Sequence, residues 1–205
     1  MKKSKSYLAY ICLLAISSLI LISQANAHGY VKKPESRAYQ CSGRDSRTPT
    51  NLNCGEGPTY SPHSIEGIKG FPAAGPADGE IAAGSLVPFA ALNEQTPTRW
   101  NKINMSTGPN IFTWYLTVAH STSNWRFYIT KADWNNSAPL TRSSFELTPF
   151  CERIDNGAVP PGQTDINFQC NVPNDRQGYH VILATWDVAD TPNAFYQVID
   201  VNLRN

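Results

Sequence analysis

Hydrophobic and polar residues alternate along residues 111–119, with Phe112, Trp114, Leu116 and Val118 set against Thr113, Tyr115 and Thr117. This period of two predicts a β-strand with one buried face. Further stretches rich in β-branched or aromatic residues are separated by Pro, Gly, Asn or Asp: Trp125–Lys131, Ser144–Thr148, Asp165–Cys170, Tyr179–Trp186 and Phe195–Leu203. Several short strands with such turns predict an all-β fold, a β-sandwich of the immunoglobulin or fibronectin type III kind.

The segment before these strands has a different pattern. His28–Val31 is predicted to be a short strand, and few periodic segments follow it until about Asn110. Turn-forming residues dominate there, as in the stretch from Gly70 to Gly79. Because a structureless loop of this length is unusual in a compact domain, we expect a long insertion of loops and short helices between the first strands, packed as a lobe that carries a binding surface.

The first 27 residues have the features of a secretory signal peptide. Lys2, Lys3 and Lys5 precede an apolar run from Tyr7 to Ile22, and the small-x-small triplet Ala25-Asn26-Ala27 ends the segment. The run is shorter than the roughly 20 residues needed to span a bilayer, so no membrane anchor is expected after processing. We expect a secreted, extracellular, monomeric protein with one domain over residues 28–205 and no appended carbohydrate-binding domain.

Charge and cysteine content limit the possible partners and the kinds of site that the chain can contain. Removing the three signal lysines from the 17 basic residues leaves 14, against 16 acidic ones, so nucleic acid is not an expected partner. Four cysteines remain beside Cys12 of the signal, an even number that indicates two disulfides in an exported chain. Three pairings are possible, and we favour the short-range one, Cys41 with Cys54 and Cys151 with Cys170. A zinc site is disfavoured, because no pair has Cys-x-x-Cys spacing.

Cleavage after Ala27 would make His28 the first residue, with its imidazole and its α-amino group available to the same cation. His120 follows the strand over residues 111–119 and should emerge at the end of the sandwich, where sites are usually built. One amine and two imidazoles favour one Cu(II) ion per chain, because Cu(II) prefers tetragonal nitrogen ligation whereas zinc prefers a tetrahedron.

The chain from residue 28 onward resembles the bacterial chitin-active lytic polysaccharide monooxygenases, once described as chitin-binding proteins, nearly from end to end. The stretches that carry the resemblance are His28–Val31, Gly70–Pro72, Gly75–Gly79, Gln95–Lys102, Thr117–Thr122, Leu147–Cys151, Asn193–Gln197 and Ile199–Leu203.

The resemblance implies roles for individual residues. His28 and His120 would form a copper brace, and Phe195 would cover one axial face of the metal, although core packing alone would also explain Phe195. Glu66 would orient water or oxidant near the copper. Val118 stands where these enzymes often have alanine and could crowd the second axial face. The resemblance further implies a buried aromatic beneath the site, Trp186, and a flat substrate-binding face of Tyr60, Thr117, Asp190, Thr191 and Asn193.

The function implied is oxidative cleavage of crystalline chitin at the anomeric carbon, using copper, an external electron donor and oxygen or hydrogen peroxide. Tyr60 is the expected sugar-stacking residue, because its ring offers apolar area together with a hydroxyl group. His63, near Tyr60 in sequence, could join that surface, although a solvated loop histidine is the favoured interpretation.

Three alternatives are weighed against this function. A glycoside hydrolase is disfavoured, because nothing in the spacing of Glu66, Asp187 and Asp190 marks a catalytic carboxylate pair. A non-catalytic chitin-binding or adhesion protein would need no histidine at its terminus. A periplasmic copper carrier would need no flat polysaccharide face.

Overall fold

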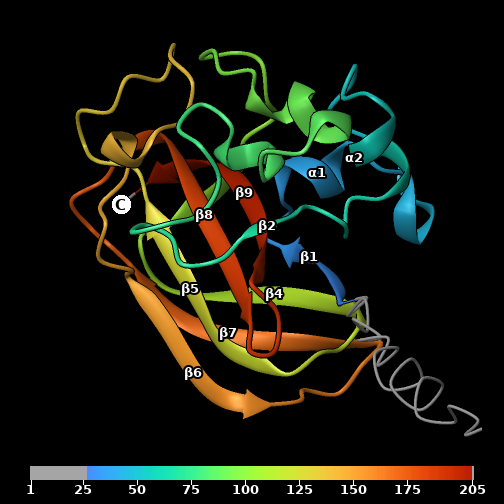
Figure 1. The fold of residues 1–205 in the computed structure, drawn as a ribbon. Helices are drawn as coiled ribbons and strands as arrows, with labels where there is room; N and C mark the ends of the chain where they lie inside the picture. Colours follow the sequence, from blue (N-terminus) through green and yellow to red (C-terminus); the bar gives the residue numbers. More distant parts are fainter. Residues whose placement is uncertain (1–26, 205) are drawn as a thin grey trace, which may run out of the picture.

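Two β-sheets pack face to face in the computed structural model, which describes residues 27–204 (Figure 1). The smaller sheet has the order β1-β4-β7, formed by His28–Lys33, Gly108–Val118 and Thr164–Val172. The larger sheet has the order β2-β9-β8-β5-β6, formed by Glu66–Ile68, Asn193–Arg204, Gly178–Val188, Thr122–Ile129 and Cys151–Ala158. A further strand, β3 (Ile103–Ser106), pairs in parallel with β9. The predicted immunoglobulin-like sandwich is confirmed.

The core between the two sheets follows from the alternation in β4. Phe112, Trp114 and Leu116 are fully buried and face apolar side chains of β5, β8 and β9. The prediction that Val118 shares this buried face is wrong, because its side chain is 45% exposed. Val118 ends the strand, opposite His28 in the neighbouring β1. The last apolar position of the alternation therefore lies at the rim of the sandwich.

A second core lies on the other face of β8 and β9, under the lobe formed by the insertion (Figure 1). The lobe contains α1, α2 and the short 3-10 helices η1, η2 and η3, over Arg37–Gln40, Glu56–Tyr60, Arg44–Ser46, Ile81–Ala83 and Val87–Asn93. Its apolar side chains, among them Ile65, Phe89 and Leu92, pack with Leu183, Tyr196 and other residues of the sheet. Because both faces of β8 are covered, its sequence contains an unbroken apolar run, from 181 to 184, in place of a strict alternation.

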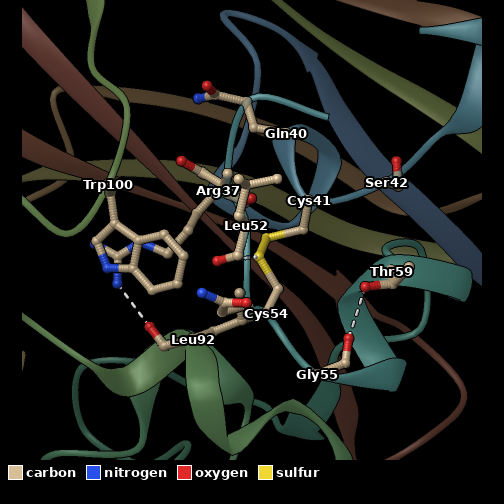
Figure 2. The surroundings of a disulfide bond; sticks show 12 residues. Arg37, Gln40, Cys41, Ser42, Leu52, Cys54, Gly55, Thr59, Leu92 and Trp100 are labelled. Atoms are coloured by element: carbon tan, nitrogen blue, oxygen red, sulfur yellow. Dashed lines mark hydrogen bonds between the residues drawn. A yellow bond between two sulfur atoms is a disulfide. The ribbon is translucent and has the colours of Figure 1, made fainter. Parts of the chain in front are cut away.

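Both disulfides have the favoured short-range pairing, Cys41–Cys54 and Cys151–Cys170. The first ties α1 to the segment before α2 within the lobe (Figure 2). The second joins β6 of the larger sheet to β7 of the smaller one, so it links the two layers of the sandwich.

Three predictions about strands are corrected. The expected strand over Ser144–Thr148 is absent, and a 3-10 helix over residues 142–144 (η4) leads instead into a single bridge between Thr130 and Phe145. Phe145 explains the apolar signal, because it is fully buried against the lobe. The edge strand β6 was not predicted, since its sequence is polar. Strands β2 and β3 interrupt the insertion that was expected to contain only loops and short helices.

The predicted signal peptide lies outside the described residues except for Ala27, which is buried beside the core. In the part of the chain that the structure covers, no helix has the length and apolarity needed to cross a membrane.

Candidate metal centre

The pairing of β1 with β4 brings His28 to the end of the sandwich where His120 emerges. His28 lies opposite Val118, two residues before His120, and the register shifts between His28 and Gly29. At this shift Thr117 Oγ1 donates a hydrogen bond to the carbonyl oxygen of His28 over 3.2 Å. Thr117, expected on the substrate face, therefore also fixes the first strand.

Gly29 permits this close approach. A Cβ atom at position 29 would lie 2.8 Å from Leu116 Cδ2 and 3.1 Å from the carbonyl oxygen of Tyr115. Any larger side chain would therefore require Leu116 or the strand itself to shift. Glycine at this position keeps His28 at its place beside the end of β4.

Buried side chains of the core hold the backbone of His120 in place. Thr122 Oγ1 donates to the carbonyl oxygen of His120 over 2.9 Å, and Trp186 Nε1 donates to the same hydroxyl group over 2.8 Å. The His120 side chain is 19% exposed. Its buried Nδ1 lies 2.8 Å from Asp190 Oδ1, but outside the angles of a regular hydrogen bond.

Phe195 and Glu66 are adjacent because β2 pairs with β9. Glu66 lies opposite Phe195 in the register, and Asn193 Nδ2 donates to Glu66 Oε1 over 2.9 Å. The Phe195 ring is fully buried, with its centroid 6.3 Å from that of His28 and 5.0 Å from that of Trp186, on which it stacks. Phe195 therefore belongs to the core and also lies beside His28, and Trp186 lies beneath it.

His63 is not the solvated loop histidine that the sequence suggested. Its ring is half-buried, edge-on to the His28 ring with the centroids 5.1 Å apart, and its carbonyl oxygen accepts the Gly29 N–H over 3.1 Å. Burial, followed by the positive charges of Arg44 and His28, lowers the pKa of His63 to about 4. The ring is thus neutral near neutral pH. The only signal in the sequence is its place between Tyr60 and Glu66.

The remaining residues of the expected substrate face lie on two separate segments. Asp190 and Thr191 are in the turn between β8 and β9, where Asp190 is exposed and Thr191 half-buried, and Asn193 begins β9. A recess of about 450 Å³ beside Glu66 and Asn193 is lined also by Ser64, Pro76 and Ser85. Asp190 thus lies at His120, and Glu66 and Asn193 lie together at the start of β9, close to Phe195. Tyr60 is 74% exposed at the end of α2, three residues before His63 in the sequence.

The side chains present fit copper in their chemistry. His28 and His120 offer imidazole nitrogens at one end of the sandwich, and imidazole is a favourable ligand of copper. In the described residues no three histidine, cysteine, aspartate or glutamate side chains converge on a possible metal site. An α-amino nitrogen on His28, which exists once Ala27 is removed, would add the third donor.

Comparisons with known proteins show the family to which the chain is similar. Residues 28–201 match the family model described as lytic polysaccharide mono-oxygenase, cellulose-degrading. The GlcNAc-binding protein A of Shewanella oneidensis is 47% identical over 97% of this chain, and that of Vibrio vulnificus is 47% identical over 92%. The chain spans about 40% of the length of these curated relatives.

Solved structures are similar over most of the chain. A lytic polysaccharide monooxygenase of Photorhabdus luminescens is 44% identical, with a TM-score of 0.82 over 86% of this chain and 98% of that one. A CBM33 protein of Bacillus amyloliquefaciens, in complex with Cu(I) after photoreduction, is 45% identical, with a TM-score of 0.77 over 86% of this chain and 100% of that one.

Proposed function

Because this chain belongs to the lytic polysaccharide monooxygenase family, we propose that it is a secreted copper-dependent enzyme that binds crystalline chitin and cleaves its glycosidic bonds oxidatively at the anomeric carbon. The observation that supports the proposal is the pairing of His28 with Val118 at the end of β4, two residues before His120. One copper ion would be held by the two imidazoles and by the amino group of His28 after removal of residues 1–27.

Copper, when bound, would supply one-electron exchange with an external donor and activation of oxygen or hydrogen peroxide for hydrogen removal from the anomeric carbon. The protein would position the reacting groups and exclude water from them. Phe195, held rigidly by its stacking on Trp186, closes the side of His28 that faces the core. Glu66, oriented by the amide of Asn193, offers a carboxylate that can accept or return a proton at the recess. Val118, which is exposed opposite His28, would limit the access of oxidant to the copper from the side of the smaller sheet.

The proposed substrate is chitin, and the docking face comprises Tyr60, Thr117, Asp190, Thr191 and Asn193. Names of the relatives support this choice, since the Shewanella and Vibrio proteins are called GlcNAc-binding proteins. The family model is described as cellulose-degrading, so cellulose is the competing substrate. A non-catalytic chitin-binding protein remains the alternative function, because the names of those relatives describe binding alone.

Product analysis of the protein beginning at His28 tests this function. Chitin incubated with the copper-loaded protein and a reductant is expected to yield oligosaccharides with oxidised C1 ends, seen by mass spectrometry, in clear excess over products from cellulose. The reaction without reductant is the control and should give none. Chitin binding without oxidised products would support the binding-protein alternative, and equal yields from cellulose would overturn the substrate assignment.

Tyr60→Ala is expected to weaken chitin binding about tenfold, because loss of an exposed aromatic anchor costs about 1–2 kcal/mol. The exposure of Tyr60 at the end of α2 leaves the fold undisturbed by this change. Binding isotherms on chitin particles measure the effect. Ile111→Ala is the matched control, since Ile111 is also exposed but lies near the start of β4, away from His120. Unchanged binding by Tyr60→Ala removes this residue from the docking face.

A further inference from the structure

One lysine holds the turn that joins β8 to β9, residues 189–192. Lys69 directly follows β2, and its Nζ donates to the carbonyl oxygens of Val188 over 2.8 Å, Thr191 over 2.5 Å and Ala189 over 3.4 Å. Its backbone N–H donates to the carbonyl oxygen of Pro192 over 2.9 Å. An ammonium group has three donors, and here all of them are directed at the last residue of β8 and the turn that follows it.

This turn carries groups that meet the candidate metal centre. Asp190 approaches His120 Nδ1 to 2.8 Å, and Asn193, just after the turn, donates to Glu66. On its other side the turn is fixed by the N–H of Ala189, which donates over 2.8 Å to the carbonyl oxygen of Ser121, the residue after His120. The place of the turn between Lys69 and Ser121 therefore decides where the Asp190 carboxylate lies relative to the His120 imidazole.

We propose that Lys69 is a positioning residue of the candidate metal centre: its ammonium group fixes the β8–β9 turn so that the Asp190 carboxylate lies at Nδ1 of the His120 imidazole. This inference rests on the proposed function for its catalytic consequence. A carboxylate at one ring nitrogen of a metal-binding histidine fixes the tautomer and the ring orientation, and loss of such a partner commonly lowers metal affinity or activity 10- to 100-fold. Lys69 would act on His120 indirectly, through the backbone of the turn that carries Asp190.

Three carbonyl oxygens that converge on one nitrogen favour a lysine at position 69. Val188 is fully buried, so its carbonyl oxygen has little access to water once the ammonium group is gone. An arginine has a planar, wider head with its donors in a fixed fork, which cannot reproduce three bonds converging on one nitrogen. Methionine has nearly the shape of the lysine stem and offers no donor, so Lys69→Met removes the bonds with little loss of packing.

The test compares Lys69→Met with Lys33→Met, an exposed lysine at the other end of β1, both in the protein beginning at His28. The metal-free proteins are studied by ¹⁵N NMR of the histidine rings above the ordinary histidine pKa, which reports the tautomer of His120. In Lys69→Met the fraction of His120 protonated at Nδ1 should fall, Cu(II) should bind about tenfold more weakly, and its EPR hyperfine splitting should change. Lys69→Arg should restore these values only in part.

A folded Lys69→Met protein whose His120 spectrum, copper affinity and EPR signal equal those of Lys33→Met would overturn the proposal. Thermal unfolding checks that the variant is folded, and Lys69→Gln, which keeps one side-chain amide donor group, takes its place under the same criteria if it is not. The metal-free spectrum requires no enzymatic activity. A parent protein that lacks oxidative activity would thus refute the proposed function while leaving the Lys69 measurement decisive.

Discussion

A protein with one additional alanine before His28 will fold normally, yet bind copper far more weakly and release no oxidised products. The extra residue converts the α-amino group of His28 into an amide, so the chelate formed by that amine and the imidazole of the same residue is lost. Loss of a direct ligand should cost more than loss of a supporting residue, so we expect a decrease in copper affinity of at least about a hundredfold. Isothermal titration with Cu(II) measures it.

The matched control is the protein that begins at His28, prepared in the same way and with the same copper loading. Circular dichroism should show equal folding, because β1 keeps its pairing with β4 when a residue precedes it, as the position of Ala27 shows. Full oxidative activity in the extended protein would refute the amine as a ligand and with it the copper brace.

Asp200→Ala will lower the free energy of unfolding by about 3–5 kcal/mol, the cost of leaving a buried charge without its partner. Asp200 on β9 and Arg37 on α1 have fully buried side chains, joined by two hydrogen bonds of 2.9 and 2.7 Å. Arg37 also donates to the carbonyl oxygen of Leu92, and the Tyr179 hydroxyl donates to Asp200 (Figure 2 shows Arg37 with Leu92). This ion pair joins the lobe to the larger sheet.

Denaturant unfolding measures that change, with Asp165→Ala as the control. Asp165 pairs with Lys32 at the surface, where both side chains are well exposed, so its loss should cost at most about 1 kcal/mol. The double variant Arg37→Met with Asp200→Leu should recover much of the lost stability, because a pair of apolar side chains removes both buried charges. Equal effects of Asp200→Ala and Asp165→Ala would contradict the role given to the buried pair.

The residues that sequence reasoning located best are those whose pattern is local. The alternation in β4 predicts its buried face, since neighbouring side chains of a strand point to opposite sides whatever they pack against. The number of cysteines left three pairings open, and the short-range pairing that their spacing favoured is the one observed. His120 could be expected at the end of the sandwich because it follows a long strand, and His28 was singled out because cleavage after Ala27 would give it an α-amino group beside its imidazole.

Sequence reasoning failed where a property depends on residues distant along the chain. Phe145 looked like part of a strand because an apolar residue buried by the lobe and one buried by a sheet have the same local pattern. β6 was missed because an edge strand with polar residues on its sides shows no apolar periodicity. Val118 continues the alternation of β4, but it lies where the opposite layer no longer covers the strand.

The candidate metal centre shows the same difference between what local sequence patterns reveal and what long-range contacts decide. By itself the sequence pointed to His28 and His120 as the proposed copper ligands, since their nitrogens are the donors that copper needs, and the resemblance to a known family added Glu66. Only the tertiary structure brought His63 against His28 and the turn of Asp190 under Lys69. These neighbours are set by the pairing of β1 with β4 and by the docking of the lobe on β9, long-range contacts whose energy comes from burial and which no local pattern of residues records.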